Sequence, residues 1–279
     1  MKRFVVVLAC MMPFATICTG HAQQGFFHQW ENRVRTTSAR QPGWVVPVVT
    51  PSSGIVQLYR ADFVRQITPA LTTTWNLDNG KGFNLIPFAN TEVDVNLPAY
   101  IEHNSPKVAD GASDFSMVLK YRFAASNAEA HNYMASLQLQ GVAATGSYKN
   151  GSAQHSINPT LVAGKGFGNF DVQSSLGGTL PTGQINAIGR TIAWNTVAQY
   201  KVGRYFWPEV EANATFFNRG PNNGKVLTFV TPGIMISKIK LRHDAKDRLA
   251  FLFGGGMQIA TSSFHPYNHA IVVTSRITF

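Results

Sequence analysis

The stretch SDFSMVLKYRFA, residues 113–124, presents two chemically different faces. Every second residue from Phe115 to Phe123 is large and apolar, whereas Lys120 and Arg122 occupy alternating positions. This period of two predicts a β-strand, because successive side chains of a strand point to opposite sides of the sheet. Such a strand belongs either to a soluble sandwich, with its polar face in water, or to a membrane barrel, with its polar face in the lumen.

The same alternation recurs along most of the chain, and Gly, Asn, Pro and Ser interrupt it at intervals. About twelve segments show it, each roughly ten residues long, which is the length that a tilted strand needs to cross a bilayer. Strands of soluble sandwiches are shorter, typically about five or six residues. The sequence therefore predicts an all-β fold, an antiparallel transmembrane outer-membrane barrel of about 12 strands. The predicted strands are 54–67, 71–77, 91–101, 113–124, 131–140, 154–164, 168–176, 190–201, 206–217, 226–239, 248–260 and 269–279.

The connections between these strands alternate in length. With a periplasmic C-terminus, the shorter connections fall on the inner side and the longer ones outside, as in known outer-membrane barrels. An aromatic cluster at one predicted inner turn, Tyr200, Tyr205, Phe206 and Trp207, suggests an interfacial belt. The predicted inner turns are 78–82, 125–130, 165–167, 202–205 and 242–247, and the predicted outer loops are 102–112, 142–153, 177–189, 218–225 and 261–268.

The N-terminus, residues 1–22, is predicted to be a secretory signal peptide. Lys2 and Arg3 precede an apolar run, and small residues stand before the expected cleavage point. Cys10 and Cys18 are the two cysteines of the chain, and both lie inside this segment. The mature protein would therefore have neither disulfides nor cysteine ligands. Cleavage would also remove Lys2 and Arg3, which lowers the formal net charge of the protein from +10 to +8.

Residues 23–53 carry no strand pattern. They contain Trp30 and Trp44 together with several prolines. We expect this segment to be a periplasmic arm or a plug of the lumen, with a disordered leader as the alternative. The barrel itself is expected to span residues 54–279.

The chain ends in a terminal aromatic residue, Phe279, with Ile277, Val273 and Ile271 on the same face of the last predicted strand. This arrangement resembles the C-terminal signal that the barrel-assembly machinery reads, and Ser275 is a polar departure from it. Ile277 and Phe279 are therefore the predicted insertion signal. The expected location is the bacterial outer membrane.

The charged-residue content of the chain restricts its possible binding partners. Charged residues make up 14% of the chain, compared with about 25% in ordinary soluble domains. The basic residues are scattered over strands and turns instead of clustering on one face, so nucleic acid is not an expected partner. Outer-membrane lipids and lipopolysaccharide are a more natural contact for the mild positive charge of an exported protein.

Charged residues on the strands predict a polar lumen. Pairing of 91–101 with 113–124 as a hairpin places Glu92 opposite Arg122 and Asp94 opposite Lys120. Opposite charges across a sheet stabilise it by roughly 0.2–1 kcal/mol per pair, whereas a lipid-exposed Arg or Lys near the midplane would cost about 2–4 kcal/mol. All four side chains are therefore predicted to face the lumen.

Glu209 and Glu211, on the polar face of another strand, are further candidates for this lining. Two interpretations of the charged residues stay open. They either tie neighbouring strands together, or they line the path of a solute.

A search for catalytic arrangements finds no convincing site. His155 and Ser156 are adjacent and so point to opposite faces of a strand, and His243 and Asp244 fall in a predicted inner turn. No zinc-type spacing or phosphate-binding loop is present. No catalytic, cofactor-binding or metal-binding residue is predicted, and no cofactor.

His265 and His269 lie near Ser263 in the last predicted outer loop. These three residues are better interpreted as solvated loop residues than as a metal or catalytic site. The chain is therefore not expected to be an enzyme.

Five short segments carry a pattern of a strand that ends near Pro, a Gly–Asp loop, a Lys–Tyr strand and a later Pro–Gly: residues 90–98, 110–114, 119–123, 222–225 and 231–233. Together they resemble the bacterial family named for the "MetA-pathway of phenol degradation" over about residues 75–279. This resemblance implies an outer-membrane barrel that moves hydrophobic or aromatic compounds, and no site residue is carried over from it. The predicted function is a channel or transporter for such small solutes. A barrel hydrolase acting on lipid or peptide, or a structural or adhesive barrel, is the alternative.

Overall fold

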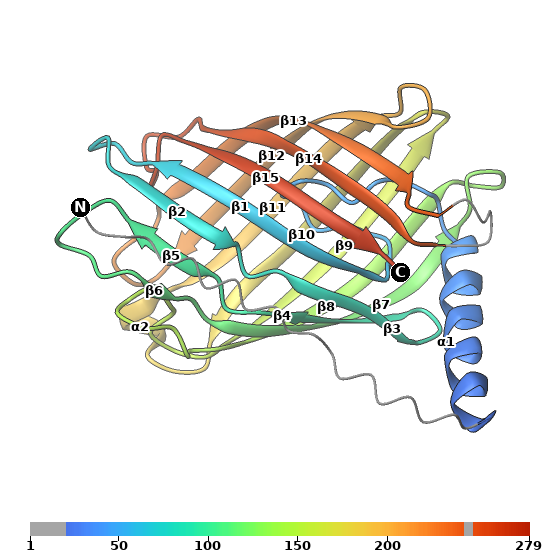
Figure 1. The fold of residues 1–279 in the computed structure, drawn as a ribbon. Coiled ribbons are helices and arrows are strands. Elements are labelled where there is room, and N and C mark those ends of the chain that lie inside the picture. The colour runs from blue at the N-terminus through green and yellow to red at the C-terminus, as the bar shows by residue number, and fades with distance from the viewer. Residues whose placement is uncertain (1–20, 243–247) are drawn as a thin grey trace, which may run out of the picture.

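The computed structural model describes residues 21–242 and 248–279, which form a closed antiparallel barrel of 12 wall strands with a helix at one end (Figure 1). The first wall strand, β1 (Leu58–Ile67), pairs with the last, β15 (His269–Thr278), and this pairing closes the barrel. The predicted fold class is confirmed. Residues 1–20 of the predicted signal peptide lie outside the described residues, as does the pair His243 and Asp244.

Most wall strands are uninterrupted and follow one another as antiparallel neighbours. Their lengths of 10 to 15 residues agree with the length that a tilted membrane-crossing strand needs. Besides β1 and β15 they are β8 (Tyr133–Ala143), β9 (Ser156–Phe167), β10 (Phe170–Pro181), β11 (Arg190–Tyr200), β12 (Phe206–Asn218), β13 (Val226–Lys240) and β14 (Ala250–Ala260).

The other wall strands are interrupted, and each carries two labels. They are β2 (Thr73–Asp78) with β3 (Gly82–Phe88), β4 (Thr91–Asn96) with β5 (Tyr100–His103), and β6 (Gly111–Ala112) with β7 (Phe115–Ser126).

The inner turn predicted at residues 78–82 is wrong, because the chain does not reverse there. β2 and β3 both pair antiparallel with β1, so the chain keeps its direction across the gap. Asp78, Asn79 and Gly80 have positive φ angles of 80°, 50° and 61°, which explains the turn-like sequence. The reversal lies instead at residues 89–90, between β3 and β4, where Asn90 has a φ of 62°.

Strand β7 shows which side of the barrel is apolar. Leu119 and Tyr121 are each 52% exposed on the outer side, whereas Lys120 and Arg122 are 4% and 3% exposed on the inner side. In a barrel with its apolar side inward, Leu119 and Tyr121 would be buried, and the two cations would be exposed. The apolar face of the opening stretch is therefore the outer surface.

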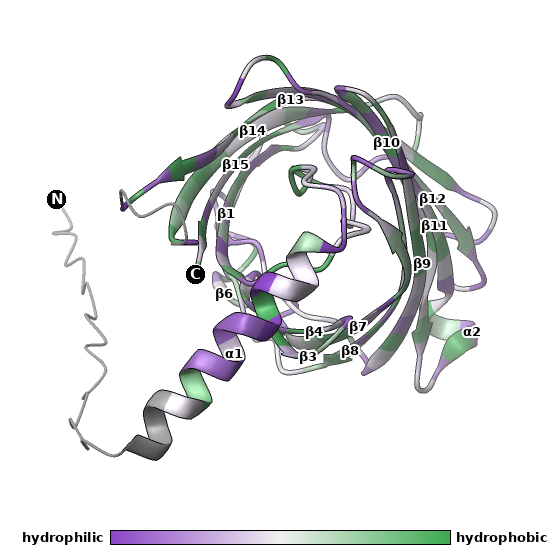
Figure 2. Cartoon of the chain, turned by 90° about the vertical axis from the view of Figure 1, so that its right-hand side faces the viewer, coloured by the Kyte–Doolittle hydropathy of each residue, from purple (hydrophilic) through white to green (hydrophobic). Residues whose placement is uncertain are grey.

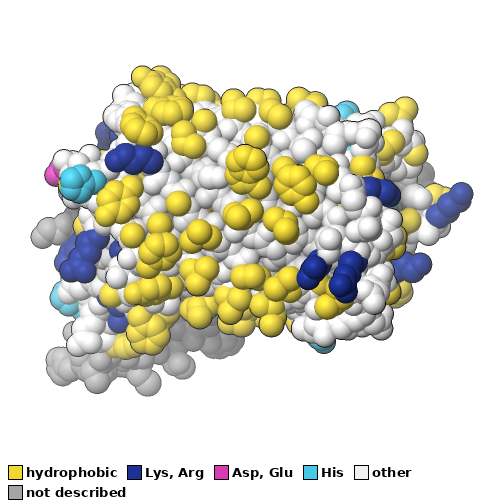
Figure 3. All heavy atoms as spheres, turned by 180° about the vertical axis from the view of Figure 1, so that it is seen from behind, with side chains coloured by type: hydrophobic (Ala, Val, Ile, Leu, Met, Phe, Trp, Pro, Cys, Tyr) yellow, Lys and Arg dark blue, Asp and Glu magenta, His cyan; other side chains and the backbone are white. Residues whose placement is uncertain are grey.

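The outer surface is apolar around the middle of the barrel. In Figure 3 hydrophobic side chains cover the centre of the face shown, and Lys and Arg gather toward its two ends. Tyr200 and Phe206 lie on this surface, as the predicted aromatic belt requires. Trp207 does not, because the strand alternation turns it inward, where it is buried beside Met235.

The N-terminal part of the described chain begins with helix α1 (His21–Ala39), which lies across one end of the barrel. Trp30 Nε1 donates to Gln57 Oε1 at 2.8 Å and Arg33 Nε donates to the Ile86 carbonyl at 3.3 Å, so the helix is fixed to the rim. Figure 2 shows that the chain then enters the ring of strands. We call residues 41–57 the internal segment. Within the described residues, no helix combines the length and the apolar character needed to span a bilayer.

The two ends of the barrel differ in their connections. The end that carries α1 has short ones, such as residues 89–90 and 168–169. The opposite end has longer ones, such as 144–155, and 182–189 with the short helix α2 (Ile185–Ile188). Most connections follow the predicted alternation of lengths, but the inner connection at 241–249 is longer than the outer one at 219–225. The periplasmic placement of the C-terminus stays a prediction. We refer to the α1 end as the inner end and to the opposite end as the outer end.

Candidate functional site

The predicted register between the two charged strands is wrong by two residues. Glu92 lies opposite Lys120, and Asp94 lies opposite Val118. The predicted hairpin loop was two residues too long, because Ile101 pairs with Gly111 and not with Ser113. Lys120 Nζ contacts Glu92 Oε1 at 3.2 Å, and both side chains are nearly inaccessible to solvent.

The two displaced residues have other partners. Asp94 Oδ1 accepts a hydrogen bond of 2.6 Å from Asn84 Nδ2. Arg122 donates to Asn90 Oδ1 at 2.7 Å and to the carbonyl of Thr37, in helix α1, at 3.0 Å. Arg122 therefore joins the barrel wall to the N-terminal helix and pairs with neither predicted carboxylate.

Glu209 and Glu211 hold the internal segment from strand β12. Glu209 Oε1 accepts the backbone N–H of Val48 at 2.9 Å. Glu211 accepts the N–H of Val49 at 2.7 Å and also that of Thr50. A carboxylate that accepts two backbone N–H groups makes strong, charge-assisted hydrogen bonds. These two glutamates therefore act here as receptors for the backbone of the internal segment.

Two arginines bind the carbonyls of the same part of the segment. Arg276, on β15, is fully buried and donates to the carbonyls of Val46 and, at 2.6 Å, Pro47. Arg60, on β1, donates to the Val48 carbonyl and forms an ion pair of 2.7 Å with Asp62. Since the segment has no secondary structure of its own, these side chains satisfy backbone groups that would otherwise be buried without partners.

Apolar packing reinforces this attachment. Val45 and Val48 of the internal segment belong to a buried cluster formed with inward residues of β1 and β12–β15. Burial of a valine side chain contributes about 1.5–3 kcal/mol. This part of the segment therefore lies against this side of the wall, and the space beside it at mid-height of the barrel lies toward β3, β4 and β7–β9. The wall members of the cluster are Val64, Trp207, Met235, Leu252, Ala270 and Val272.

The later part of the internal segment contacts the opposite wall. Ser53 donates from N and Oγ to Gln173 Oε1, at 3.1 and 2.9 Å, and its carbonyl accepts from Ser136 Oγ at 2.9 Å. Gln138 Nε2 donates to the Ser52 carbonyl at 3.1 Å. Neutral side chains of β8 and β10 thus hold this part, apart from Glu92, which accepts the N–H of Val56.

Three cavities lie beside the segment along the barrel. The outer-mouth cavity, of about 360 Å³, and the mid-lumen cavity, of about 210 Å³, share Lys81, Asn96 and Gln140 as lining residues. The inner-end cavity, of about 530 Å³, shares Val46 and Val56 with the mid-lumen cavity. The cavities therefore follow one another along the barrel, and Val46 and Val56 of the internal segment lie at the boundary between the inner-end and mid-lumen cavities.

The six predicted lumen residues fall into two groups. Glu92, Asp94 and Lys120 border the mid-lumen cavity. Arg122, Glu209 and Glu211 hold the N-terminal helix and the internal segment. Whether any of them contacts a passing solute stays a prediction.

The sequence analysis named none of Arg60, Arg276 and Gln173 as a candidate lumen residue, although Gln173 lies on the polar face of the predicted strand 168–176. Each of the three occupies the face opposite the large apolar residues of its strand, and that signal would have found them. In the last strand only the apolar face entered the prediction, so Arg276 on the opposite face was not considered as a lumen residue. The prolines of the internal segment also disfavour its pairing as a wall strand, which is the signal for an internal position.

The histidines considered for catalysis have structural contacts. His155 Nδ1 receives the N–H of Ala144 at 3.0 Å. His265 contacts the Ser262 carbonyl at 2.7 Å and Asn268 Oδ1 at 3.0 Å, within the loop between β14 and β15. These contacts stabilise loops at the outer end. Each histidine keeps its partners within its own or a neighbouring loop.

The closed barrel with an apolar outer face and a polar interior is the fold of an outer-membrane β-barrel. The structure is similar to the crystal structure of the COG4313 outer membrane channel from Pseudomonas putida F1. The TM-score is 0.57 at 11% sequence identity, over 85% of this chain and 100% of that one. At this identity the similarity establishes the fold alone.

Two other solved structures match more weakly. A porin refined at 1.8 Å resolution gives a TM-score of 0.36 at 7% identity, over 80% of this chain and 100% of that chain. The outer membrane channel DcaP of Acinetobacter baumannii gives 0.35 at 8%, over 80% and 96%. Neither score supports an argument. No family model and no curated protein matches the chain, so the resemblance to the MetA-pathway family stays a prediction.

Proposed function

We propose that this protein is an outer-membrane channel or transporter for small, hydrophobic or aromatic solutes. The observation that carries the proposal is the series of three adjacent cavities along the barrel, two of which are lined in part by the internal segment. A structural or adhesive barrel has no need of such cavities. The described fold also matches that of a known outer-membrane channel.

The location in the outer membrane is supported by the surface of the barrel. Leu119, Leu137, Leu161 and Leu176 are each about half exposed on the successive strands β7–β10. A contiguous apolar surface of this kind is rare on soluble monomers and is the expected surface of a lipid-facing barrel. The predicted signal peptide and the insertion signal, Ile277 and Phe279, support export and assembly in the same way.

The chemistry of the inner-end cavity supports an apolar or aromatic solute. Trp44, Leu58 and Leu252 contribute to its walls. Ligand cavities of about 300–1,000 Å³ with mostly apolar walls and few polar groups accommodate small organic molecules. The resemblance to the MetA-pathway family implies solutes of the same class.

The hydrolase and the adhesive barrel are less well supported. A hydrolase needs a nucleophile within hydrogen-bonding distance of its base. Among the residues that the structure describes, the hydrogen bonds of His155, His265 and His103 join them to loop backbone, asparagine and threonine, with no bond to a serine hydroxyl.

The proposal is tested by liposome swelling with phenyl glucoside and methyl glucoside, which differ in the aromatic ring. The native barrel should pass both solutes and favour the aromatic one. Replacement of Val46 and Val56 together by Ala should raise the flux several-fold, and replacement of both by Phe should lower it, because these residues divide two cavities.

Val197→Ala is the matched control, because Val197 is a fully buried valine of β11 that belongs to the barrel wall and borders neither cavity. Correct folding is checked by heat-modifiable migration in gels. A folded barrel that admits neither solute, and whose Ala variant is equally tight, would defeat the channel proposal.

A further inference from the structure

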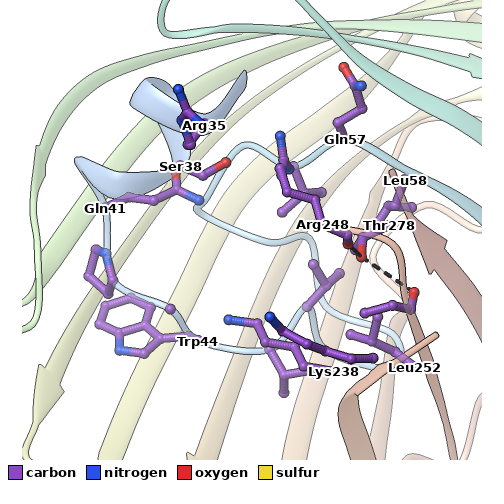
Figure 4. A pocket seen from close by; sticks show the side chains of 17 residues that line it. Arg35, Ser38, Gln41, Trp44, Gln57, Leu58, Lys238, Arg248, Leu252 and Thr278 are labelled. Carbon is purple, nitrogen blue, oxygen red and sulfur yellow. Dashed lines mark hydrogen bonds between the residues drawn. The ribbon is translucent and has the colours of Figure 1, made fainter. Parts of the chain in front are cut away.

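The inner-end cavity combines apolar walls with cationic side chains. Trp44, Val45 and Leu252 lie on its apolar side, and Lys238 and Arg248 project toward it from the barrel wall (Figure 4). Such a combination suits a solute that has an apolar body and a negative charge, because the apolar walls and the cations can each contact one part of it.

An irregularity in strand β13 places one of these cations. The pairing of β13 with β14 shifts between Ile236 and Ile239, so that an extra residue enters β13. Lys238 occupies this bulge with a positive φ of 57°, a conformation uncommon for lysine. Regular alternation from buried Ser237 would send Lys238 toward the lipid, and the bulge turns it to the cavity instead. Its Nζ lies 3.5 Å from the position that a β-carbon on Gly43 would take.

The side chains that line the cavity carry charge of one sign. In the described part of the chain no Asp or Glu lines it, whereas Arg35, Lys238 and Arg248 do. Glu31 of helix α1 attracts Arg248 but does not belong to the lining. Lys238 experiences repulsion from Lys201 and Arg248. Because Lys238 is exposed, a bound anion would reach it, relieve this repulsion and accept charge-assisted hydrogen bonds.

We propose that the inner-end cavity is a binding site for an amphipathic organic monoanion. Its carboxylate would lie between Lys238 and Arg248, and its apolar body would lie against Trp44 and Leu252. The inference deepens the proposed function and rests on it, since it narrows the solute class from apolar molecules to apolar acids. The lining of the mid-lumen cavity is charged as well, with Lys81 and Lys120 beside two carboxylates, Glu92 and Asp94, and this polarity agrees with a solute that carries a charged group.

The test is equilibrium dialysis with barrels in zwitterionic nanodiscs, with empty nanodiscs subtracted. The probes are 4-phenylbutyrate, its neutral analogue 4-phenylbutanol and its cationic analogue 4-phenylbutylamine. Decanoate is a further probe, which distinguishes an aromatic from a fatty acid. The native barrel should bind the carboxylates most tightly. The double variant Lys238→Gln with Arg248→Gln should weaken carboxylate binding about tenfold or more, since each lost charge-assisted hydrogen bond weakens binding substantially.

Lys107→Gln is the matched control, because it removes a cation from an exposed loop at the outer end. It should leave the affinity unchanged. Equal binding of acid and alcohol by the native barrel, or full carboxylate affinity in the double variant, would overturn the site. If carboxylate binding depends on both cations but liposomes admit no solute, the site stands and the transport function fails. If solutes pass without any dependence on these cations, the function stands and the site fails.

Discussion

The two halves of the internal segment are held by different chemistry. The first half, residues 45–50, is bound mainly by charged side chains, Glu209, Glu211, Arg60 and Arg276. The second half, residues 52–57, is bound mainly by the hydroxyls and amides of β8 and β10, with a single carboxylate. The first half also packs into the buried apolar cluster.

This difference indicates which half is the firmer one. A hydrogen bond to a charged group contributes about 1.5–3 kcal/mol, whereas one between neutral groups contributes about 0.5–1.5 kcal/mol. Any displacement of the internal segment is therefore expected to begin at the second half, beside the mid-lumen cavity. The first half would stay attached to the wall for longer. The following predictions test whether the first half is indeed held more strongly than the second.

The largest effect is expected for Arg276→Met. Arg276 is fully buried, and its loss leaves the carbonyls of Val46 and Pro47 without donors. Removal of one partner from a buried charged network destabilises a protein by about 3–5 kcal/mol. Urea unfolding in detergent should show a lowered midpoint, and single-channel conductance should rise as the first half leaves the wall.

Arg190→Met is the control for this variant. Arg190 is an exposed wall residue whose Nε donates to Asn218 at the outer end, away from the internal segment. Its replacement should change neither the unfolding midpoint nor the conductance appreciably. Equal behaviour of the two variants would show that the internal segment does not depend on Arg276.

A smaller effect is expected for Gln173→Leu in the second half. Gln173 is buried, and it accepts from both the backbone and the hydroxyl of Ser53. The loss of a neutral acceptor that leaves buried donors without partners costs about 1–3 kcal/mol. The unfolding midpoint should therefore fall less than in Arg276→Met, whereas conductance fluctuations should increase.

Ser175→Ala serves as the comparison on the same strand. Ser175 is buried on the inner face of β10 and accepts from Asn195 without touching the internal segment. It should leave the conductance noise of the native barrel unchanged. A larger loss of stability in Gln173→Leu than in Arg276→Met would reverse the order of the two halves.

The barrel was predictable because alternation along a strand is a local property. Phe115, Leu119 and Lys120 reveal two faces without knowledge of any partner strand. Register is not local, and the prediction for Glu92 failed because it depended on where the hairpin closes. The inner turn predicted at residues 78–82 was wrong for a related reason. Residues with positive φ, such as Asp78, occur both in turns that reverse the chain and in irregularities within one strand, and the local sequence does not distinguish the two.

The candidate site was predictable only in part. Residue type and face indicated that Glu209 and Glu211 point inward, but nothing in their own strand reveals that they bind backbone N–H groups of Val48 and Val49. That contact joins residues about 160 positions apart in sequence. Lys238 was unpredictable as well, because its orientation follows from a bulge.

The smallest effect on stability is expected for Asp114→Asn at the outer rim, where a carboxylate again accepts backbone N–H groups. Its carboxylate accepts backbone N–H groups of Thr145, Gly146 and Ser152 at 3.0, 2.9 and 2.6 Å, as Glu211 does for the internal segment. Burial tends to raise the pKa of Asp114, but the hydrogen bonds from Ser152, Gly146 and Thr145 outweigh it and lower the pKa below the ordinary 3.8. Here water and salt screen the interaction, so it should stabilise the loop only weakly.

A lowered pKa fixes the sign of the pH dependence. The stabilisation is fully present above about pH 3.8 and is lost as the pH falls through the lower pKa of the folded state. A fluorophore on Ala153→Cys, in a chain that begins at residue 23 and so contains no other cysteine, would report loop motion. Its anisotropy should fall below pH 3.8 in that protein and be already lower at pH 7 after Asp114→Asn. If acid instead released the internal segment before this loop, the carboxylates in the lumen would hold backbone N–H groups more weakly than Asp114 does at the rim. The expectation that burial strengthens these hydrogen bonds would then be wrong.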